Sequence, residues 1–304
     1  MRARTIRDGV KWIGAVDWDR RLFDSLVPLP DGTSYNAYLV EGREATALID
    51  TVQPTKAALL RANLDRVERI DHVISQHAEQ DHSGLLPEVL ERYPDATAHA
   101  TPLGRKMLVD HLGVAAERIQ PVKDGDTLPL GDRTLRFVHT PWVHWPETMS
   151  TYLAEDRILF TCDFFGSHLA TSELYAGEDP CVLEAAKRYF GEIMQPFRSH
   201  IRKNLAKVRE LEVELIAPSH GPLHDHPELI LAAWEAWSSE TPQNLVVIPH
   251  VTMHGSTGLM VERLIAALVE HGVQVQPFDL VSLDEGRIAM ALVDAATVVF
   301  GTPT

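Results

Sequence analysis

Ser75-Gln76-His77-Ala78-Glu79-Gln80-Asp81-His82-Ser83-Gly84 is the stretch from which the fold of this 304-residue chain is best predicted. It carries an H-x-E-x-D-H pattern, in which every named side chain can bind a metal. The apolar run at 70–74 before it predicts a short buried strand, and the apolar spacing at 85–90 after it predicts a helix. The stretch therefore follows the carboxyl end of a strand, where sheet-based folds place their chemistry.

The spacing within this stretch favours convergence of its polar side chains. Alternate residues of an extended or tightly turning segment point the same way, so His77, Glu79 and Asp81 share a side. His82 can then turn in beside Asp81. Imidazole and carboxylate without thiolate suit iron, zinc or manganese. Taken alone, the pattern leaves open a less favoured interpretation, a polar turn that carries two surface histidines.

Three later residues also follow predicted strands. His144 comes after the strand that ends near Val138, Asp163 directly follows the apolar run 158–162, and His220 follows the run 215–217. Each of them alone could be a core histidine, a helix cap or a turn residue. Together with the first stretch, four strand ends that carry histidine or carboxylate indicate a binuclear metal site.

Composition narrows the class of protein. The chain is 45% hydrophobic and 23% charged, which is typical of globular proteins. Its net charge of −15 and its lack of a basic patch argue against nucleic acid as a partner. The acidic balance also disfavours binding to anionic membranes, and the longest apolar runs are too short to span a bilayer. The N-terminus lacks the apolar stretch of a signal peptide.

Cysteine usage indicates the compartment. The two cysteines, Cys162 and Cys181, fit a reducing cytoplasm better than a disulfide framework. We expect both to be buried small residues. The side chain of Cys162 is expected to point away from the metal-ligand candidates, because adjacent residues of a strand face opposite sides.

The order of the predicted elements indicates two units. Through residue 240, strands in pairs with helices between them predict two sheets packed face to face and covered by helices, an αββα sandwich. Residues 238–244 have the composition of a linker. After it, strands at 245–249, 273–278 and 297–300 alternate with helices at 257–270 and 283–293, which predicts a doubly wound parallel sheet. We therefore expect domains at 1–240 and 245–304.

With these residues in view, the sequence resembles the metallo-β-lactamase superfamily and, within it, the flavodiiron proteins. The segments that surround the candidate ligands also match: Gly32-Thr33-Ser34-Tyr35-Asn36-Ala37-Tyr38-Leu39, His144-Trp145-Pro146-Glu147-Thr148-Met149, Asp163-Phe164-Phe165-Gly166-Ser167-His168 and Ala217-Pro218-Ser219-His220-Gly221-Pro222. The resemblance covers nearly the whole chain.

The resemblance implies two iron ions. One would be held by His77, Glu79 and His144, the second by Asp81, His82 and His220, and Asp163 would bridge them. Hydrolases of the superfamily carry a histidine where this chain has Glu79, and they use zinc to activate water. A third carboxylate favours iron, which makes redox chemistry available. His168 and His139 are expected to lie near the site without being ligands.

The segment after residue 245 resembles the start of a flavodoxin-like domain. A strand, a loop of small residues and a helix N-terminus can form a phosphate cradle, and the candidate residues are Thr252, His254, Gly255, Ser256 and Thr257. In a flavodoxin-like sheet the strand order is 2-1-3-4-5, whereas this sequence supplies three such strands. The domain is therefore expected to be incomplete, with the strand at 297–300 at an exposed edge that a partner or further chain would cover. FMN is expected in a complete protein of this kind.

The activity implied is reduction of dioxygen to water, or of nitric oxide to nitrous oxide. In the family, FMN relays electrons from rubredoxin or from a flavoprotein donor, and two subunits assemble head to tail. Two alternatives remain open at this stage. One is a binuclear-metal hydrolase of the same fold, and the other is a diiron protein that binds oxygen or nitric oxide as a sensor without turnover.

Overall fold

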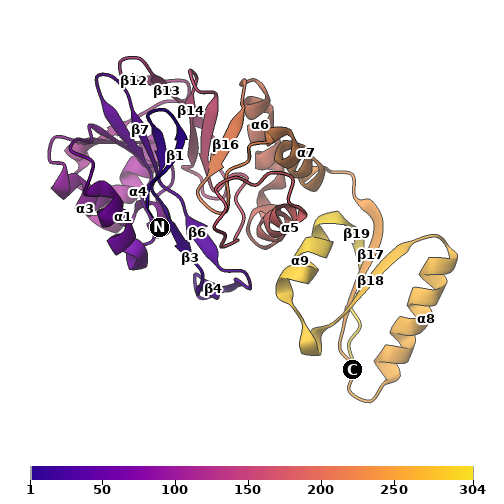
Figure 1. Cartoon of the computed structure of the whole chain (residues 1–304). Helices are drawn as coiled ribbons and strands as arrows, with labels where there is room; N and C mark the ends of the chain where they lie inside the picture. The colour runs from indigo at the N-terminus through magenta and orange to yellow at the C-terminus, as the bar shows by residue number, and fades with distance from the viewer. Residues whose placement is uncertain (1, 304) are drawn as a thin grey trace.

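Two large mixed sheets dominate the computed structural model, which describes residues 2–303 (Figure 1). The first sheet contains, in spatial order, β1 (Arg4–Arg7), β2 (Val10–Trp12), β7 (Tyr38–Glu41), β8 (Thr46–Ile49), β9 (His72–Ile74), β10 (Thr97–Ala100) and β11 (Ile119–Pro121). The second contains β12 (Thr127–Pro129), β13 (Thr134–His139), β14 (Met149–Leu153), β15 (Ile158–Cys162) and β16 (Leu215–Pro218).

Helices cover the outer face of each sheet (Figure 1). On the first sheet they are α1 (Ala57–Leu64), α3 (Leu86–Arg92) and α4 (Pro102–Leu112), and on the second α5 (Pro180–Tyr189), α6 (Arg198–Arg209) and α7 (Pro227–Ser238). Three apolar cores separate the four layers. One packs helices on the first sheet, one lies between the sheets and one packs helices on the second sheet. The predicted αββα sandwich is confirmed.

The strand β8 shows why the first sheet forms in the middle of this stack. Leu48 belongs to the core under the helices, whereas Ala47 and Ile49 belong to the core between the sheets. A strand that is buried on both faces is apolar throughout instead of alternating. Helix α4 has equally clear ends, because the Thr101 side chain accepts a hydrogen bond from the Gly104 amide at 3.0 Å and Gly113 adopts the left-handed conformation that ends helices.

Several short strands were not anticipated. They are β3 (Ala15–Asp17), β4 (Leu22–Phe23), β5 (Val27–Pro28) and β6 (Thr33–Tyr35), which form two small antiparallel pairs. The apolar run at 10–15 is divided between β2 and β3. The division occurs at Gly14, where an added Cβ would lie 2.4 Å from the Tyr35 carbonyl oxygen. Close backbone approach, which only glycine permits, therefore bends the chain there.

A third sheet follows the linker. It consists of parallel strands in the order β18 (Gln274–Asp279), β17 (Gln243–His250) and β19 (Ala295–Val298), joined by α8 (Ser256–Glu270) and α9 (Glu285–Asp294). This is the order 2-1-3 with which a flavodoxin-like sheet begins. The last strand ends two residues earlier than predicted, and Phe300 beyond it is 75% exposed. None of the helices in residues 2–303 is long and apolar enough to cross a membrane.

Helix α9 joins the third sheet to the sandwich (Figure 1). Arg188 at the end of α5 pairs with Asp284, and Lys187 pairs with Asp294 at 2.5 Å. Helix α5 ends as an α-helix at Tyr189 and continues as a π-helical turn, η3 (Phe190–Met194). Gly191 in this turn lies so close to α9 that an added Cβ would be 2.8 Å from the backbone of Ala289. Helix α9 is thus seated on this turn, which means that its backbone packs directly against Gly191.

Gly191→Ala is therefore expected to weaken the seating of α9 by about 1–3 kcal/mol, the usual cost of overpacking. Hydrogen exchange of the β17–β19 amides should speed up while exchange within the sandwich stays unchanged. Gly258→Ala in α8 is the matched control, because its Cβ would meet Thr252 at an ordinary 3.7 Å. Equal exchange rates in both variants would contradict this account of the interface.

His99 on β10 is a buried histidine remote from the candidate ligands. Its ring stacks on Phe137, and its Nε2 lies 3.1 Å from Nδ1 of His72. Burial, aided by the charge of His72, lowers the pKa of His99 to about 4. Between pH 6.5 and about pH 4, His99 is therefore protonated in the unfolded chain but neutral in the folded chain. The free energy of unfolding thus decreases as the pH is lowered through this range.

We expect wild type to lose about 3 kcal/mol more than His99→Gln between pH 7 and pH 4, since each pKa unit corresponds to about 1.4 kcal/mol. Urea unfolding of the metal-free proteins at several pH values measures the difference. Parallel stability curves for the two proteins would show that His99 does not titrate in this way.

Candidate metal centre

All seven residues predicted as metal ligands lie together at one edge of the two sheets. They come from four chain segments: the loop after β9 with the short helix α2 (Gln80–Ser83), the β13–β14 loop, the end of β15 and the end of β16. Their side chains form two adjoining groups, in which the possible ligand atoms lie within 4.8 Å of one another. The groups are His77, Glu79, His144 and Asp163, and Asp81, His82 and His220.

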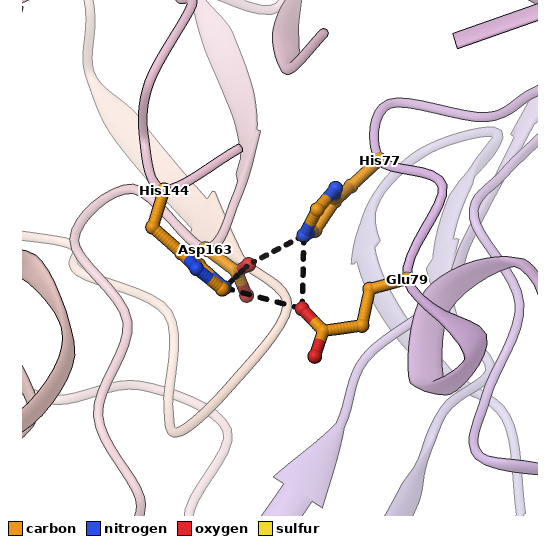
Figure 2. Close-up of side chains that lie close together, drawn as sticks. All are labelled: His77, Glu79, His144 and Asp163. Carbon is orange, nitrogen blue, oxygen red and sulfur yellow. Dashed lines mark hydrogen bonds and ion pairs between the residues drawn. The ribbon is translucent and has the colours of Figure 1, made fainter. Parts of the chain in front are cut away.

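In the first group the side chains point toward a common centre (Figure 2). Oε2 of Glu79 lies 3.0 Å from Nε2 of His77 and 3.1 Å from Nε2 of His144. Oδ2 of Asp163 lies 3.4 Å from the same two nitrogens. Two atoms that each bind one metal at about 2.1 Å lie about 3.0–3.4 Å apart in octahedral or tetrahedral geometry. The first group thus has the dimensions of a metal site.

The second group has the same dimensions. Nε2 of His82 and Nε2 of His220 each lie 3.2 Å from an oxygen of Asp81. The other oxygen of Asp163, Oδ1, lies 3.1 Å from His82 and 3.3 Å from His220. Asp163 therefore presents one oxygen to each group, which is the arrangement of a carboxylate between two cations.

The polar atoms at this centre fit cations better than they fit one another. Both carboxylate oxygens of Asp81 and of Asp163 are buried without a hydrogen-bond partner in the described residues. A buried polar atom without a hydrogen-bond partner lowers the free energy of unfolding by about 1–3 kcal/mol, and a charged atom lowers it by more. Two metal ions would satisfy these oxygens, and the donor set of imidazole and carboxylate suits iron, zinc or manganese.

The electrostatics of the centre lead to the same interpretation. Burial favours the neutral forms, but hydrogen bonds to His144 and His77 lower the pKa of Glu79, and nearby histidines hold the pKa of Asp163 well below its usual range. Burial lowers the pKa values of His144 and His220, but the adjacent carboxylates of Asp163, Glu79 and Asp81 outweigh it and raise the pKa of His144 to about 9 and of His220 to about 10. Cations are favoured at this position, whether they are protons or metals.

One face of the centre is open. The side chains of His77 and Asp163 are at most 1% exposed, whereas those of Glu79 and His144 are 12% and 17% exposed. The ring of Trp145 covers His77 at a centroid distance of 4.9 Å. Asp24, in the β4–β5 turn, adjoins Glu79, and partial burial together with the Glu79 carboxylate raises its pKa to about 6. A small molecule would reach the first group from this side.

The candidate histidine ligands differ in the group that accepts a hydrogen bond from their Nδ1 atom. Oε1 of Glu147 accepts a hydrogen bond from His77 Nδ1 at 2.7 Å, and the Ser34 carbonyl oxygen accepts one from His220 Nδ1 at 2.7 Å. Nδ1 of His82 is buried and has no partner among residues 2–303. Glu147 was not among the residues singled out from the sequence. The signal for it was the rule that metal-binding histidines usually donate their other nitrogen to a carboxylate or carbonyl.

Expectations for the cysteines were partly wrong. Cys162 is buried, but its sulfur does not point away, since it lies within 4.8 Å of ligand atoms of His82 and Asp163. The backbone of Cys162 has a positive φ of 51° and the pairing with β16 shifts there, so strand alternation no longer holds. Cys181 is exposed at the first turn of α5. Both thiols are free.

The other histidines singled out lie outside the two groups. His168 is buried with its ring 4.8 Å from that of His220, and its Nδ1 lies 2.9 Å from the Thr33 hydroxyl. His139 lies further along, where its Nε2 is 3.2 Å from the Val122 carbonyl oxygen. His168 thus contacts a ligand candidate, whereas His139 supports the edge of the sandwich.

The predicted phosphate loop has the expected local structure. Residues 251–255 connect the carboxyl end of β17, the middle strand of its sheet, to the N-terminus of α8. Gly255 has a positive φ of 85°. The Thr252 hydroxyl accepts from the amides of Gly255 at 3.1 Å and Gly258 at 3.4 Å, which orders the loop. His254, Gly255 and Ser256 are exposed, and Thr257 is buried.

Comparison with known proteins identifies the relatives of this chain. The family described as "ODP family beta lactamase" matches residues 33–221. The coenzyme F420H2 oxidase of Methanothermobacter marburgensis is 36% identical over 99% of this chain and 78% of its own length. The nitric oxide reductase of Moorella thermoacetica is 35% identical over 98% of this chain and 77% of its own length.

The fold agrees with these relatives. The solved rubredoxin oxygen:oxidoreductase of Desulfovibrio gigas superposes with a TM-score of 0.94 at 31% identity, over 99% of this chain and 78% of that one. Sequence, fold and the arrangement of strand ends thus agree, and the chain belongs to the flavodiiron protein family of oxidoreductases.

Proposed function

We propose that this protein is a diiron oxidoreductase that reduces dioxygen to water or nitric oxide to nitrous oxide. His77, Glu79 and His144 would hold one iron, Asp81, His82 and His220 the other, and Asp163 would bridge them. The observation that carries this proposal is the position of Asp163, whose two oxygens each face one group at 3.1–3.4 Å.

Glu79 decides between iron chemistry and hydrolysis. It stands where the hydrolytic members of the superfamily have a histidine, and it lies within 3.1 Å of both His77 and His144. With Asp81 and Asp163 it brings three carboxylates to the pair, and harder oxygen ligands favour iron over zinc. Iron, when bound, can change its oxidation state and pass electrons to a substrate, whereas zinc cannot. The chain itself orients the ligands, buries the bridge and leaves the Glu79 and His144 side open to a small gas molecule.

Electrons would reach this centre through FMN. The loop of Thr252, His254, Gly255, Ser256 and Thr257 would cradle the flavin phosphate, because it joins the carboxyl end of a central parallel strand to a helix N-terminus. A relative named as a rubredoxin oxygen:oxidoreductase supports a rubredoxin-like donor, and a flavoprotein is the alternative donor. We further propose domains at 1–240 and 245–304, a head-to-tail homodimer or higher assembly, and a cytoplasmic location consistent with two free thiols.

Anaerobic quantitation of metal and flavin, followed by gas consumption with a chemical reductant and a flavin-bearing partner, tests the proposal. We expect two irons per chain and steady consumption of dioxygen or nitric oxide. Reconstitution with redox-inert zinc is the control and should abolish consumption. Tightly held zinc in the purified protein, together with ester or phosphodiester hydrolysis that survives this replacement, would overturn the assignment.

A further inference from the structure

Glu147 is a buried carboxylate in the segment between β13 and β14, 3% exposed. One of its oxygens, Oε1, accepts hydrogen bonds from Nδ1 of His77 at 2.7 Å and from the Ala78 amide at 3.0 Å. Since a carboxylate only accepts, His77 carries a proton on Nδ1, which leaves Nε2, the nitrogen that faces Glu79 and Asp163, as the atom that would bind a metal. Glu147 thus fixes both the tautomer and the orientation of this ligand.

The position of Glu147 is itself fixed from the other side. Its carbonyl oxygen accepts a hydrogen bond from the Thr101 hydroxyl at 2.8 Å. Thr101 follows β10 and also caps α4, so the segment that carries Glu147 is attached to the first sheet. Glu147 therefore holds His77 from a rigid support instead of a mobile loop.

This support is specific to one half of the centre. The corresponding nitrogen of His220 donates to a neutral carbonyl oxygen, that of Ser34, at 2.7 Å. His82 has no partner for its Nδ1 in the described part of the chain. A charged acceptor makes an imidazole a stronger ligand than a neutral acceptor or none. The two proposed metal positions therefore differ in the acceptors that hold the second ring nitrogen of their histidines.

We propose that Glu147 is a positioning residue that sets the metal affinity of the half-site of His77, Glu79 and His144, separately from the half-site of Asp81, His82 and His220. The inference rests on the proposed ligand assignment. Loss of the Glu147 charge is expected to weaken one metal position by about 10–100-fold, as for other outer partners of metal ligands, and to leave the second position within about threefold.

Anaerobic titration of metal-free Glu147→Gln with Co²⁺, followed by visible absorption and equilibrium dialysis, tests this. Glutamine keeps the size and an acceptor oxygen but removes the charge. We expect wild type to bind two cobalt ions tightly and Glu147→Gln to bind one tightly and one weakly. The spectrum of its one-cobalt form should match that of His77→Ala and differ from that of His220→Ala. Glu147→Ala, which removes the acceptor altogether, should show the same loss or a larger one.

Glu192→Gln is the matched control, because Glu192 is a partly buried carboxylate that pairs with Arg188 and belongs to neither ligand group. It should bind two cobalt ions as wild type does. Wild type with fewer than two sites would refute the ligand assignment itself. Two unchanged sites in Glu147→Gln, or equal weakening of both with unchanged thermal unfolding of the metal-free protein, would refute the role of Glu147 alone.

Discussion

Asp163→Ala is expected to empty both halves of the centre and to abolish gas reduction. Its two oxygens face the two groups separately, so one substitution removes a ligand from each. The remaining histidines and carboxylates would still be close, but neither group would keep its shared anion. The loss of affinity should exceed the ~10–100-fold that removal of an outer partner costs, and turnover should fall below detection.

Iron content and gas consumption of the purified variant measure this effect. Asp17→Asn is the matched control, since Asp17 is also buried but pairs with Lys56 at 2.8 Å and belongs to neither ligand group. It should retain two irons and wild-type activity. An Asp163→Ala protein that still holds two irons would show that this carboxylate does not bridge the pair.

Removal of the metals is expected to produce the largest change in stability. A ligand at 1,000 times its dissociation constant stabilises the folded state by about 4 kcal/mol. Two independent sites at this saturation would contribute about 8 kcal/mol, which corresponds to roughly 15 °C or more in the unfolding midpoint. The physical reason lies in the oxygens of Asp81 and Asp163, which are buried without hydrogen-bond partners among residues 2–303 and depend on a cation for compensation.

Differential scanning calorimetry of the loaded and chelated protein, both kept anaerobic, gives the shift. Asp163→Ala serves as the internal comparison, because its midpoint should respond little to added iron. A wild-type midpoint that is unchanged by chelation would indicate that the folded state does not depend on metal at this position.

The convergence of the seven candidate ligands could be predicted because each of them follows a strand, and strand ends of a layered sheet meet at one edge. His77, His144 and His220 come from segments far apart in the chain, yet strand-end position placed all three. The αββα layers could be predicted for a similar reason. A strand such as β8, which is apolar on both faces, needs a covering layer on each side of its sheet.

What the sequence did not predict depends on contacts between distant backbones. Gly14 and Gly191 have their effects through close approach to Tyr35 and Ala289, and neither approach is visible in local patterning. The positive φ of Cys162 reverses the side that alternation assigns to its thiol. Glu147 was present in the matched segment, but its role emerges only when β9 and the β13–β14 loop are brought together.

The seating of α9 has a consequence for assembly. Arg188 and Lys187 hold its two ends, and Gln195 and Arg198 reach the carbonyl oxygens of Leu292 and Val293. The sheet of β17 is thereby attached to the sandwich at both ends of α9 and by hydrogen bonds near its C-terminus. In the proposed dimer, each copy would then lose little internal freedom on association, so less of the contact energy would be offset by ordering. Complementary shape, more than a swinging linker, would then determine how two copies meet.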